Sequence, residues 1–230
     1  MKIGVICAME EELRVLVENL DFSAKKTRHG FIFHTGSIGR HDLVLVQSGI
    51  GKVMSAISVT LLCQLFNVEA IINTGSAGAL DSRLKIGDLV IAEKLAYHDV
   101  DVTAFGYKYG QMAGQDLFYK SSRYFIAELK RVTNFPQDNI KVGLITSSDS
   151  FIASPEKAEE IRSYFPEVLA VEMEGASVAQ AAKSLNKPFL IIRAISDTAN
   201  HEANINFDEF ILEAGRKSAL LLIKLLKSMI

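Results

Sequence analysis

The sequence predicts a single α/β domain built on a mixed, largely parallel central sheet with helices on both of its faces. Short apolar runs that are typical of buried strands alternate with segments of helical periodicity along the whole chain. Strands and helices that alternate in this way usually form a parallel sheet covered on both sides. The 230 residues contain no linker, repeat or low-complexity segment, so we expect residues 1–230 to form one domain.

Each strand is expected where a short apolar run is bounded by turn residues. Buried strands are predicted at 2–7, 70–74, 88–96, 141–146, 168–174 and 188–196, and a strand pair at 27–39 and 42–48 is predicted to turn at residues 39–42. Helices follow from apolar residues at helical spacing. They are predicted at 10–19, 51–66, 121–132, 155–164, 176–185 and 208–226, and Ser154 is expected to cap the fourth, with Pro155 in its first turn. Residues 98–118 form a long polar and aromatic connection, and loops of that length are usually functional or mobile.

The composition excludes several classes of protein. The net charge is −2 with both signs interspersed, which argues against nucleic-acid binding because that requires a basic surface. No stretch approaches the roughly 20 apolar residues of a membrane span, and the apolar run after Met1 lacks the features of a signal peptide. Cys7 and Cys63 lie in apolar runs and are expected to be buried, reduced thiols. We therefore expect a cytoplasmic protein with neither nucleic acid nor membrane as a partner.

Metal binding is not expected, because two cysteines cannot form a zinc set and the histidines lack metal-ligand spacing. The histidines are His29, His34, His41, His98 and His201.

A glycine-rich segment precedes the second predicted helix. Residues 49–52 read Gly-Ile-Gly-Lys and suggest an anion-binding loop. It is not a Walker motif, since Val46 replaces the first glycine and Val53 replaces the Ser or Thr that follows the lysine. Close backbone packing is the favoured interpretation, and a ligand near the loop is the alternative.

The strongest functional signal is the end of the strand at 168–174, where Glu172 and Glu174 follow an apolar run. Residues two apart on a strand point to the same face, and ligands of open α/β sheets bind at the carboxyl ends of the strands. Buried carboxylates are costly unless they meet a cation, hydrogen-bond donors or a polyhydroxyl ligand such as a sugar. This pattern therefore indicates an enzyme.

Other strand ends carry residues suited to the same chemistry. Glu12 follows the first strand, Ser76 follows the strand at 70–74, and Arg193 and Asp197 end the last strand. The carboxyl ends of parallel strands share one edge, so Glu12, Ser76, Glu174 and Asp197 are expected to meet in one cleft. Each has a structural alternative: Glu12 as a first-turn acid, Ser76 and Asp197 as turn or cap residues, and Arg193 as a counter-ion.

Several segments together resemble the 5′-methylthioadenosine/S-adenosylhomocysteine nucleosidase family, within the purine nucleoside phosphorylase-like superfamily. The segments are 8–12 (AMEEE), 48–52 (SGIGK), 73–78 (NTGSAG), 98–107 (HDVDVTAFGY), 148–152 (SDSFI), 171–174 (VEME) and 193–197 (RAISD). The resemblance covers essentially the whole chain and implies a nucleoside phosphorylase-like fold, a homodimer and no cofactor. It implies hydrolysis of the adenine–ribose bond of methylthioadenosine and S-adenosylhomocysteine, and of 5′-deoxyadenosine, in methionine salvage.

The resemblance also implies a role for each site residue. Asp197 would protonate adenine N7, Glu12 would take a proton from the attacking water, and Glu174 would hold the 2′ and 3′ hydroxyls of ribose. Phe151 would stack on adenine and the Ile152 backbone would contact its edge, while Met9, Ile50, Met173 and Phe207 would line the ribose and alkylthio pocket. Val102, Phe105 and Tyr107 would close the site of a neighbouring subunit. Ser76, Glu172, Arg193 and Ser196 complete the expected substrate-binding set.

The residues suit this chemistry independently of the resemblance. Cleavage of an N-glycosidic bond develops oxocarbenium character, as in glycoside hydrolysis, where one carboxylic acid and one carboxylate divide the work. Adenine leaves poorly as an anion, and a positioned acid contributes roughly 10²–10⁴-fold. Asp197 must therefore hold a proton near neutral pH, which burial and nearby carboxylates would favour, whereas Glu12 must stay ionised, which a wetter position would favour.

Alternative functions remain open. A phosphorylase needs Arg or Lys to hold phosphate, but residues 10–12 and 73–74 are Glu-Glu-Glu and Asn-Thr where phosphorylases of the superfamily carry arginines. A non-catalytic purine sensor would not need both Glu12 and Asp197, and a structural protein would need neither. Futalosine and adenosine monophosphate are alternative substrates, and the monophosphate is disfavoured because no basic cluster is evident for its phosphate.

Overall fold

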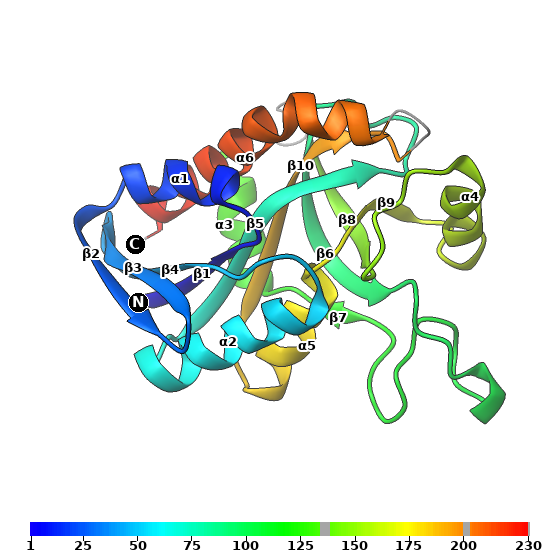
Figure 1. Cartoon of the computed structure of the whole chain (residues 1–230), viewed down its shortest axis with the longest axis horizontal. Helices are drawn as coiled ribbons and strands as arrows, with labels where there is room; N and C mark the ends of the chain where they lie inside the picture. Colours follow the sequence, from blue (N-terminus) through cyan, green and yellow to red (C-terminus); the bar gives the residue numbers. More distant parts are fainter. Residues whose placement is uncertain (134–138, 200–202, 230) are drawn as a thin grey trace.

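The structure is a computed structural model that describes residues 1–133, 139–199 and 203–229, of which 204 and 205 by backbone only. Figure 1 shows helices packed on both faces of a twisted sheet, as the sequence predicts. The strands are β1 (Lys2–Cys7), β2 (Asp21–Arg28), β3 (Phe31–Ile38), β4 (His41–Gln47), β5 (Ala70–Ala79), β6 (Leu89–Tyr97), β7 (Tyr119–Lys120), β8 (Ile140–Ser147), β9 (Val168–Glu172) and β10 (Phe189–Asp197). The helices are α1 (Glu10–Glu18), α2 (Lys52–Phe66), the short 3₁₀ helix η1 (Thr103–Phe105), α3 (Arg123–Val132), α4 (Pro155–Tyr164), α5 (Gly175–Ser184) and α6 (Ala203–Ser228).

The sheet is mixed and is organised around β5. On one side of β5, the strands β10, β6, β8 and β9 pair in turn, and β9 returns to β5, so that these strands close a ring. On the other side, β1, β4, β3 and β2 extend the sheet outward. The pairings of β5 with β1 and β10, and of β8 with β6 and β9, are parallel, while β9 pairs antiparallel with β5. The prediction of a mixed α/β sheet covered by helices is confirmed.

The partner of β5 changes along its length. Residues Ala70 to Asn73 pair with β1, whereas Gly78 and Ala79 pair with β9, so that β5 has no strand partner on this side at residues 74–77. The prediction that the strand ends at Thr74 in a turn at 75–78 is wrong, because these residues continue β5 alongside β10. The change of partner opens the sheet at the carboxyl end of β1, which is where a ligand site is expected in such sheets.

Two apolar layers lie on the two faces of the sheet. One contains residues of α2 and α5 with Ile6 and Ile71, and the other contains residues of α1, α3 and α6 with Val5 and Ile72. Adjacent strand residues contribute to opposite layers because strand side chains alternate between faces. Cys7 and Cys63 are buried free thiols, as predicted.

The strand pair predicted to turn at residues 39–42 is confirmed as β3 and β4, although β3 begins at Phe31 rather than at residue 27. Residues 27 and 28 end β2, which was not predicted and which forms a hairpin with β3. That hairpin turns at His29 and Gly30, and both residues have positive φ. A two-residue hairpin loop of the mirror-image turn type requires that conformation. All residues of β2 are exposed, so no buried face marks this strand in the sequence. The short β7 and η1 were not predicted, and α6 begins at Ala203 rather than Asp208.

The helices of the part of the chain that the structure describes include none long and apolar enough to cross a membrane.

Candidate active site

A cavity of about 410 Å³, a size typical of small-molecule sites, opens where β1, β9 and β10 end, beside residues 76–78 of β5. Most of the predicted site residues line it. They are Met9, Glu12, Ile50, Ser76, Phe151, Ile152, Glu172, Met173, Glu174, Ser196, Asp197 and Phe207. The cavity thus collects side chains that follow β1 and β9, side chains at the end of β10, and residues within β5. The expectation that all these strand ends share an edge of parallel strands is wrong for β9, which pairs antiparallel with β5.

Glu12 bridges the gap between β1 and the open edge of β5. Its Oε2 accepts from the backbone N–H groups of Ala8 (2.9 Å) and Met9 (3.2 Å), and its Oε1 accepts from the N–H (2.9 Å) and Oγ (3.1 Å) of Ser76. Because Met9 precedes α1, the carboxylate also satisfies an N–H at the helix start, as the structural alternative expects. At this place Glu12 substitutes for the missing strand partner of β5.

The expectation that Glu12 occupies a wetter position is wrong, because its side chain is buried and the residue is 2% exposed. Burial raises the pKa of Glu12, and this rise is opposed by the charge of Arg193 and by the hydrogen bonds from Ser76 and Met9. The groups that favour the ionised form are therefore donors and a cation rather than water, and they offset only part of the effect of burial.

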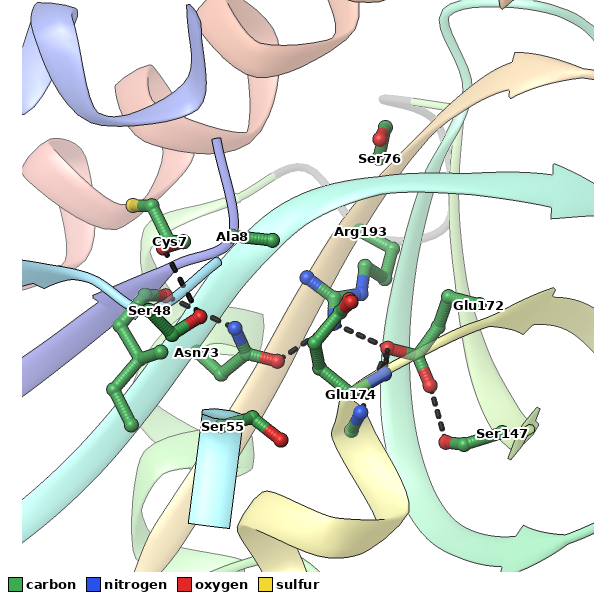
Figure 2. Close-up of polar contacts among 12 residues, drawn as sticks. Cys7, Ala8, Ser48, Ser55, Asn73, Ser76, Ser147, Glu172, Glu174 and Arg193 are labelled. Carbon is green, nitrogen blue, oxygen red and sulfur yellow. Dashed lines mark hydrogen bonds and ion pairs between the residues drawn. The ribbon is translucent and has the colours of Figure 1, made fainter. Parts of the chain in front are cut away.

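Glu172 and Arg193 form a buried ion pair beneath the cavity (Figure 2). Arg193 Nη2 donates to Glu172 and to Asn73 Oδ1 (2.6 Å). Glu172 also accepts from Ser147 Oγ and from the backbone N–H of Glu174 (3.0 Å) and of Gly175 (2.7 Å). Burial alone would raise the pKa of Glu172, but Arg193 and these donors hold it below its usual range.

Glu174 shares the same cation more loosely. Its Oε1 accepts from the Gly51 N–H (2.9 Å), and its Oε2 lies 3.6 Å from Arg193 Nη2. Burial and the adjacent charge of Glu172 raise the pKa of Glu174 to about 8, although Arg193 opposes the shift. Glu172 and Glu174 are two residues apart and share one cation, yet the pKa of Glu172 is lowered and that of Glu174 is raised.

Asp197 lies at the end of β10 and has no cation among its contacts in the described part of the chain. Its Oδ2 accepts from Ser196 Oγ (3.0 Å) and its Oδ1 from the Ala199 N–H (2.9 Å). The residue is 2% exposed, and burial raises its pKa, which confirms the direction that the sequence predicts. Burial is the cause; neighbouring carboxylates contribute no resolved effect.

Glycines of β5 make room for these charged side chains. In the β5–β10 register, Gly75 lies opposite Arg193 and Gly78 lies opposite Asp197. A Cβ at position 75 would lie 2.5 Å from Glu12 Oε1 and 2.7 Å from Arg193 Nη1, and one at position 78 would lie 2.7 Å from Asp197 Oδ1. The segment that looks like a turn is therefore a strand whose glycines admit the polar groups of the site.

Comparisons with known proteins agree with this geometry. Residues 2–230 match the phosphorylase superfamily. The 5′-methylthioadenosine/S-adenosylhomocysteine nucleosidase of Listeria welshimeri is 47% identical over 232 aligned residues, which cover 99% of this chain and 100% of the relative. This chain belongs to the 5′-methylthioadenosine/S-adenosylhomocysteine nucleosidase family.

Solved structures of nucleosidases in this family have the same fold. The S. pneumoniae enzyme with the transition-state inhibitor MT-ImmA superposes with a TM-score of 0.98 at 58% identity, with 99% of each chain covered. The S-adenosylhomocysteine nucleosidase of Streptococcus pyogenes in complex with 5-methylthiotubericidin has a TM-score of 0.98 at 53% identity, covering 100% of this chain and 98% of that one. The family and the nucleoside phosphorylase-like fold that the sequence motifs imply are confirmed, and the chain is an N-glycosyl hydrolase.

Some residues predicted for the nucleosidase site lie outside its cavity. Arg193 lies below the cavity and is bound to other protein groups. Val102, Phe105 and Tyr107 belong to the long 98–118 connection and do not line the cavity of their own chain. Phe105 is 80% exposed.

The cavity also has lining residues that the sequence did not single out as site residues: Ala8, Ala77, Gly78, Ser150, Val171 and Asp208. Most of them are sequence neighbours of predicted residues. Their closeness to the motifs is the feature of the sequence that could have identified them. The small side chains of Ala8, Ala77 and Gly78 contribute space rather than chemistry.

The structure offers no candidate metal centre among the residues it describes. His201, one of the histidines considered for metal binding, lies outside the described residues.

Proposed function

We propose that this nucleosidase hydrolyses the bond between adenine and C1′ of ribose in 5′-methylthioadenosine and S-adenosylhomocysteine, and in 5′-deoxyadenosine. The products would be adenine and the corresponding 5-substituted ribose, so that the activity belongs to methionine salvage and the recycling of S-adenosylmethionine by-products. The observation that carries the proposal is the charge of the cavity. Glu12, Glu172, Glu174 and Asp197 line it, and none of its described lining residues is a lysine or an arginine.

Asp197 is proposed as the general acid. Its raised pKa favours the protonated form, which can donate to adenine N7 as the glycosidic bond breaks. The contacts of Asp197 use one donor for each of its oxygens, which leaves the acid proton available to a ligand in the cavity. The departing base would then leave neutral rather than as an anion.

Glu12 is proposed as the general base for the attacking water. Four donor contacts and the charge of Arg193 favour its carboxylate form despite burial. Water would add to C1′ of the oxocarbenium-like sugar, and Glu12 would accept the proton that the water loses. In this proposal Asp197 is the carboxylic acid and Glu12 the carboxylate that glycoside hydrolysis requires. The two differ in that Glu12 has four donor contacts and a nearby cation, whereas Asp197 has two donor contacts and no cation among its described contacts.

Glu174 is proposed to hold the 2′ and 3′ hydroxyls of ribose. Only the Gly51 N–H donates directly to its carboxylate among the described contacts, and Arg193 is 3.6 Å away, so that the carboxylate can still accept hydroxyl donors. Binding of a diol favours the ionised form and opposes the raised pKa of the free site. Glu172 lines the same cavity, but its oxygens already accept from Arg193, Ser147 and the backbone, so that its proposed role is to orient its neighbours.

The base and the 5′ tail are proposed to bind apolar side chains. Phe151 lines the cavity, is 45% exposed, and meets Phe207 edge-on with ring centroids 5.7 Å apart, which leaves a ring face for adenine. Met9, Ile50 and Met173 supply the apolar, polarisable surface that a thioether prefers.

A homodimer is proposed to complete the site. Ile50, Val53 and Ile57 are exposed around the start of α2, and Phe105 is exposed on the 98–118 connection. Apolar exposure of this kind is typical of a protein interface. Val102, Phe105 and Tyr107 would then contact the cavity of the other subunit. Sedimentation of purified protein should give a dimer, and a monomer at micromolar concentration would contradict this part of the proposal.

A cytoplasmic location, one domain spanning residues 1–230 and the absence of a cofactor remain proposals. The buried thiols of Cys7 and Cys63 support a reducing compartment.

The nearest rival is a phosphorylase. Phosphate would require Arg or Lys at the cavity, whereas carboxylates repel a dianion and can activate water. Adenine release from S-adenosylhomocysteine should therefore proceed in phosphate-free buffer, with S-ribosylhomocysteine identified by mass and no rate increase on addition of phosphate. Release that depends on phosphate and yields a ribose 1-phosphate would contradict the proposal, and no release from either nucleoside would favour the sensor.

A further inference from the structure

The glycine-rich loop at residues 49–52 donates two backbone N–H groups to carboxyl groups of the protein itself. The Gly51 N–H donates to Glu174 Oε1 (2.9 Å), and the Lys52 N–H donates to Asp149 Oδ1 (2.8 Å). Gly51 is the N-cap of α2 and has no side chain, so that two carboxylates from distant segments satisfy these N–H groups. A Cβ at Gly51 would lie 3.0 Å from Asp149 Oδ1, so that the close approach at this glycine is to a side chain and not, as the favoured interpretation expected, to the backbone.

The side chain of Lys52 also binds carboxylates, those of Asp99 and Asp149. Its Nζ lies 2.6 Å from Asp99 Oδ2 and 3.6 Å from Asp149 Oδ2, and 5.4 Å from the centre of the Tyr97 ring. The Asp149 N–H in turn donates to Asp99 Oδ2 (3.2 Å). A cation in the first turn of a helix is electrostatically unfavourable, so that α2 alone does not explain a lysine here.

The network joins the two sides of the cavity. Gly51 and Lys52 are adjacent, and they hold Glu174, the proposed ribose-binding group, and Asp149, which lies two residues before Phe151. Phe151 is 45% exposed, so that packing of the ring itself fixes it weakly. Its position depends instead on residues 148–150, which are held by Asp149 and by the bonds between Ser148 and Ser150.

We propose that Lys52 and Asp149 are positioning residues that set the Phe151 ring relative to the carboxylate of Glu174. The pair would fix the separation between the base-stacking ring and the ribose-binding group, neither of which it touches. This inference rests on the proposed function for the identity of the ligand groups. According to this inference, Lys52 and Asp149 influence adenine affinity although neither of them lines the cavity.

Adenine affinity measured by calorimetry tests the inference, because it requires no turnover. Lys52→Met removes the charge and keeps the N–H and the apolar stem, whereas Lys52→Arg keeps the charge. Asp149→Asn keeps an acceptor for the Lys52 N–H and removes the charge. Lys94→Met is the matched control, since Lys94 also pairs with a carboxylate (Glu167, 2.5 Å), lies over an aromatic ring and has a similarly exposed side chain, 21% against 24% for Lys52.

Lys52→Met and Asp149→Asn should each weaken adenine binding and raise KM for methylthioadenosine by about tenfold, because small displacements of binding groups are costly. Their kcat should change less than KM, Lys52→Arg should restore most of the affinity, and Lys94→Met should bind as the wild type does. The double variant Lys52→Met/Asp149→Asn should be no weaker than the worse single variant.

Unchanged adenine affinity in folded Lys52→Met or Asp149→Asn protein would overturn the inference. An equal loss in Lys94→Met would overturn it as well, because the effect would then be general. Wild-type protein that binds adenine without hydrolysing either nucleoside would instead contradict the proposed function, and the affinities of the variants would still decide the positioning role.

Discussion

Glu172 and Asp197 line the same cavity and are both buried, yet their pKa values are shifted in opposite directions. Glu172 accepts from Arg193, Ser147 and two backbone N–H groups, and its pKa is lowered. Asp197 accepts from one hydroxyl and one N–H, and its pKa is raised. Burial alone would raise both pKa values, so the hydrogen-bond and charge partners of each carboxyl decide the direction of its pKa shift.

This difference separates a structural region of the site from a reactive one. The ion pair of Glu172 and Arg193 uses its charge to orient the start of α5 and Glu174 (Figure 2). Asp197 has few partners and its pKa is raised, which is the direction that the proposed general acid requires. The comparison predicts that substitutions on the two sides will fail in different ways, in chemistry at Asp197 and in stability at Glu172.

The largest effect is expected for Asp197→Asn. The amide cannot transfer a proton to the leaving base, so that kcat for methylthioadenosine should fall by about 10²–10⁴-fold, which corresponds to about 3–5 kcal/mol. Stability and nucleoside binding should change little, and steady-state kinetics with calorimetry measures both. Turnover within tenfold of the wild type would remove Asp197 from the proposed role.

Glu172→Gln should act mainly on stability. It removes the closest partner of the buried Arg193 cation, and breaking a buried ion pair typically costs about 3–5 kcal/mol. The free energy of unfolding in urea should therefore drop by about 3 kcal/mol. Glu160→Gln breaks an exposed pair with Lys157 and provides the control, with a much smaller expected loss because solvent screens the pair. Similar losses of unfolding free energy in the two variants would mean that the buried ion pair stabilises the fold no more than the exposed one.

The pH dependence of stability should reveal the proton on Glu174. Because its pKa is raised to about 8, the folded protein retains a proton that the unfolded chain releases above about pH 4.3. The free energy of unfolding should therefore decrease as the pH rises toward 8, by at most about 1.4 kcal/mol per pH unit for this proton. Glu174→Gln should make the decrease shallower.

The range from pH 6.5 to about 8 isolates this effect from buried histidines. The pKa of His98 is lowered by burial to about 4, and its unfolded value is near 6.5, so that its contribution to stability rises with pH only below that range. Equal slopes for wild type and Glu174→Gln between pH 6.5 and 8 would contradict a protonated Glu174 in the free site.

Ser196→Ala should have the smallest effect and sharpen the description of Asp197. The Ser196 hydroxyl donates to Asp197 and lowers its pKa, so that its loss should raise that pKa further. The alkaline limb of kcat/KM should then move to higher pH, while kcat near pH 7 changes by less than about tenfold, as expected for one hydrogen bond. A shift toward lower pH would contradict the assignment of this limb to Asp197.

The cluster of acids could be predicted because short apolar runs lead into Glu174 and Asp197 and precede Glu12. The shared edge of parallel strands accounts for β1 and β10, which run parallel to β5, but not for β9, which pairs antiparallel with β5. The course of β5 could not be predicted, since Gly75 and Gly78 in a Gly-Ser-Ala-Gly segment are typical of a turn. They are needed in a strand only because Glu12, Arg193 and Asp197 cross it, and those contacts join residues far apart in the chain.

The burial of Glu12 was missed for a similar reason. A first-turn glutamate is usually exposed, and the donors that hold it come from the end of β1 and from the open edge of β5. That open edge exists because β5 exchanges β1 for β9 along its length, a feature of tertiary structure without a local pattern. The hairpin of β2 and β3 was not predicted, because β2 buries neither face and therefore has no alternating apolar pattern in the sequence.

The central claim is that Asp197 supplies the proton that adenine needs to leave. The most direct test compares wild type and Asp197→Asn on methylthioadenosine and on a 5-methylthioribosyl 4-nitrophenyl ether, whose leaving group is stable as an anion. The account predicts a loss of about 10²-fold or more on the nucleoside and less than about tenfold on the nitrophenyl substrate. Equal losses on both substrates would contradict the proton transfer and leave Asp197 with a role in binding or folding only.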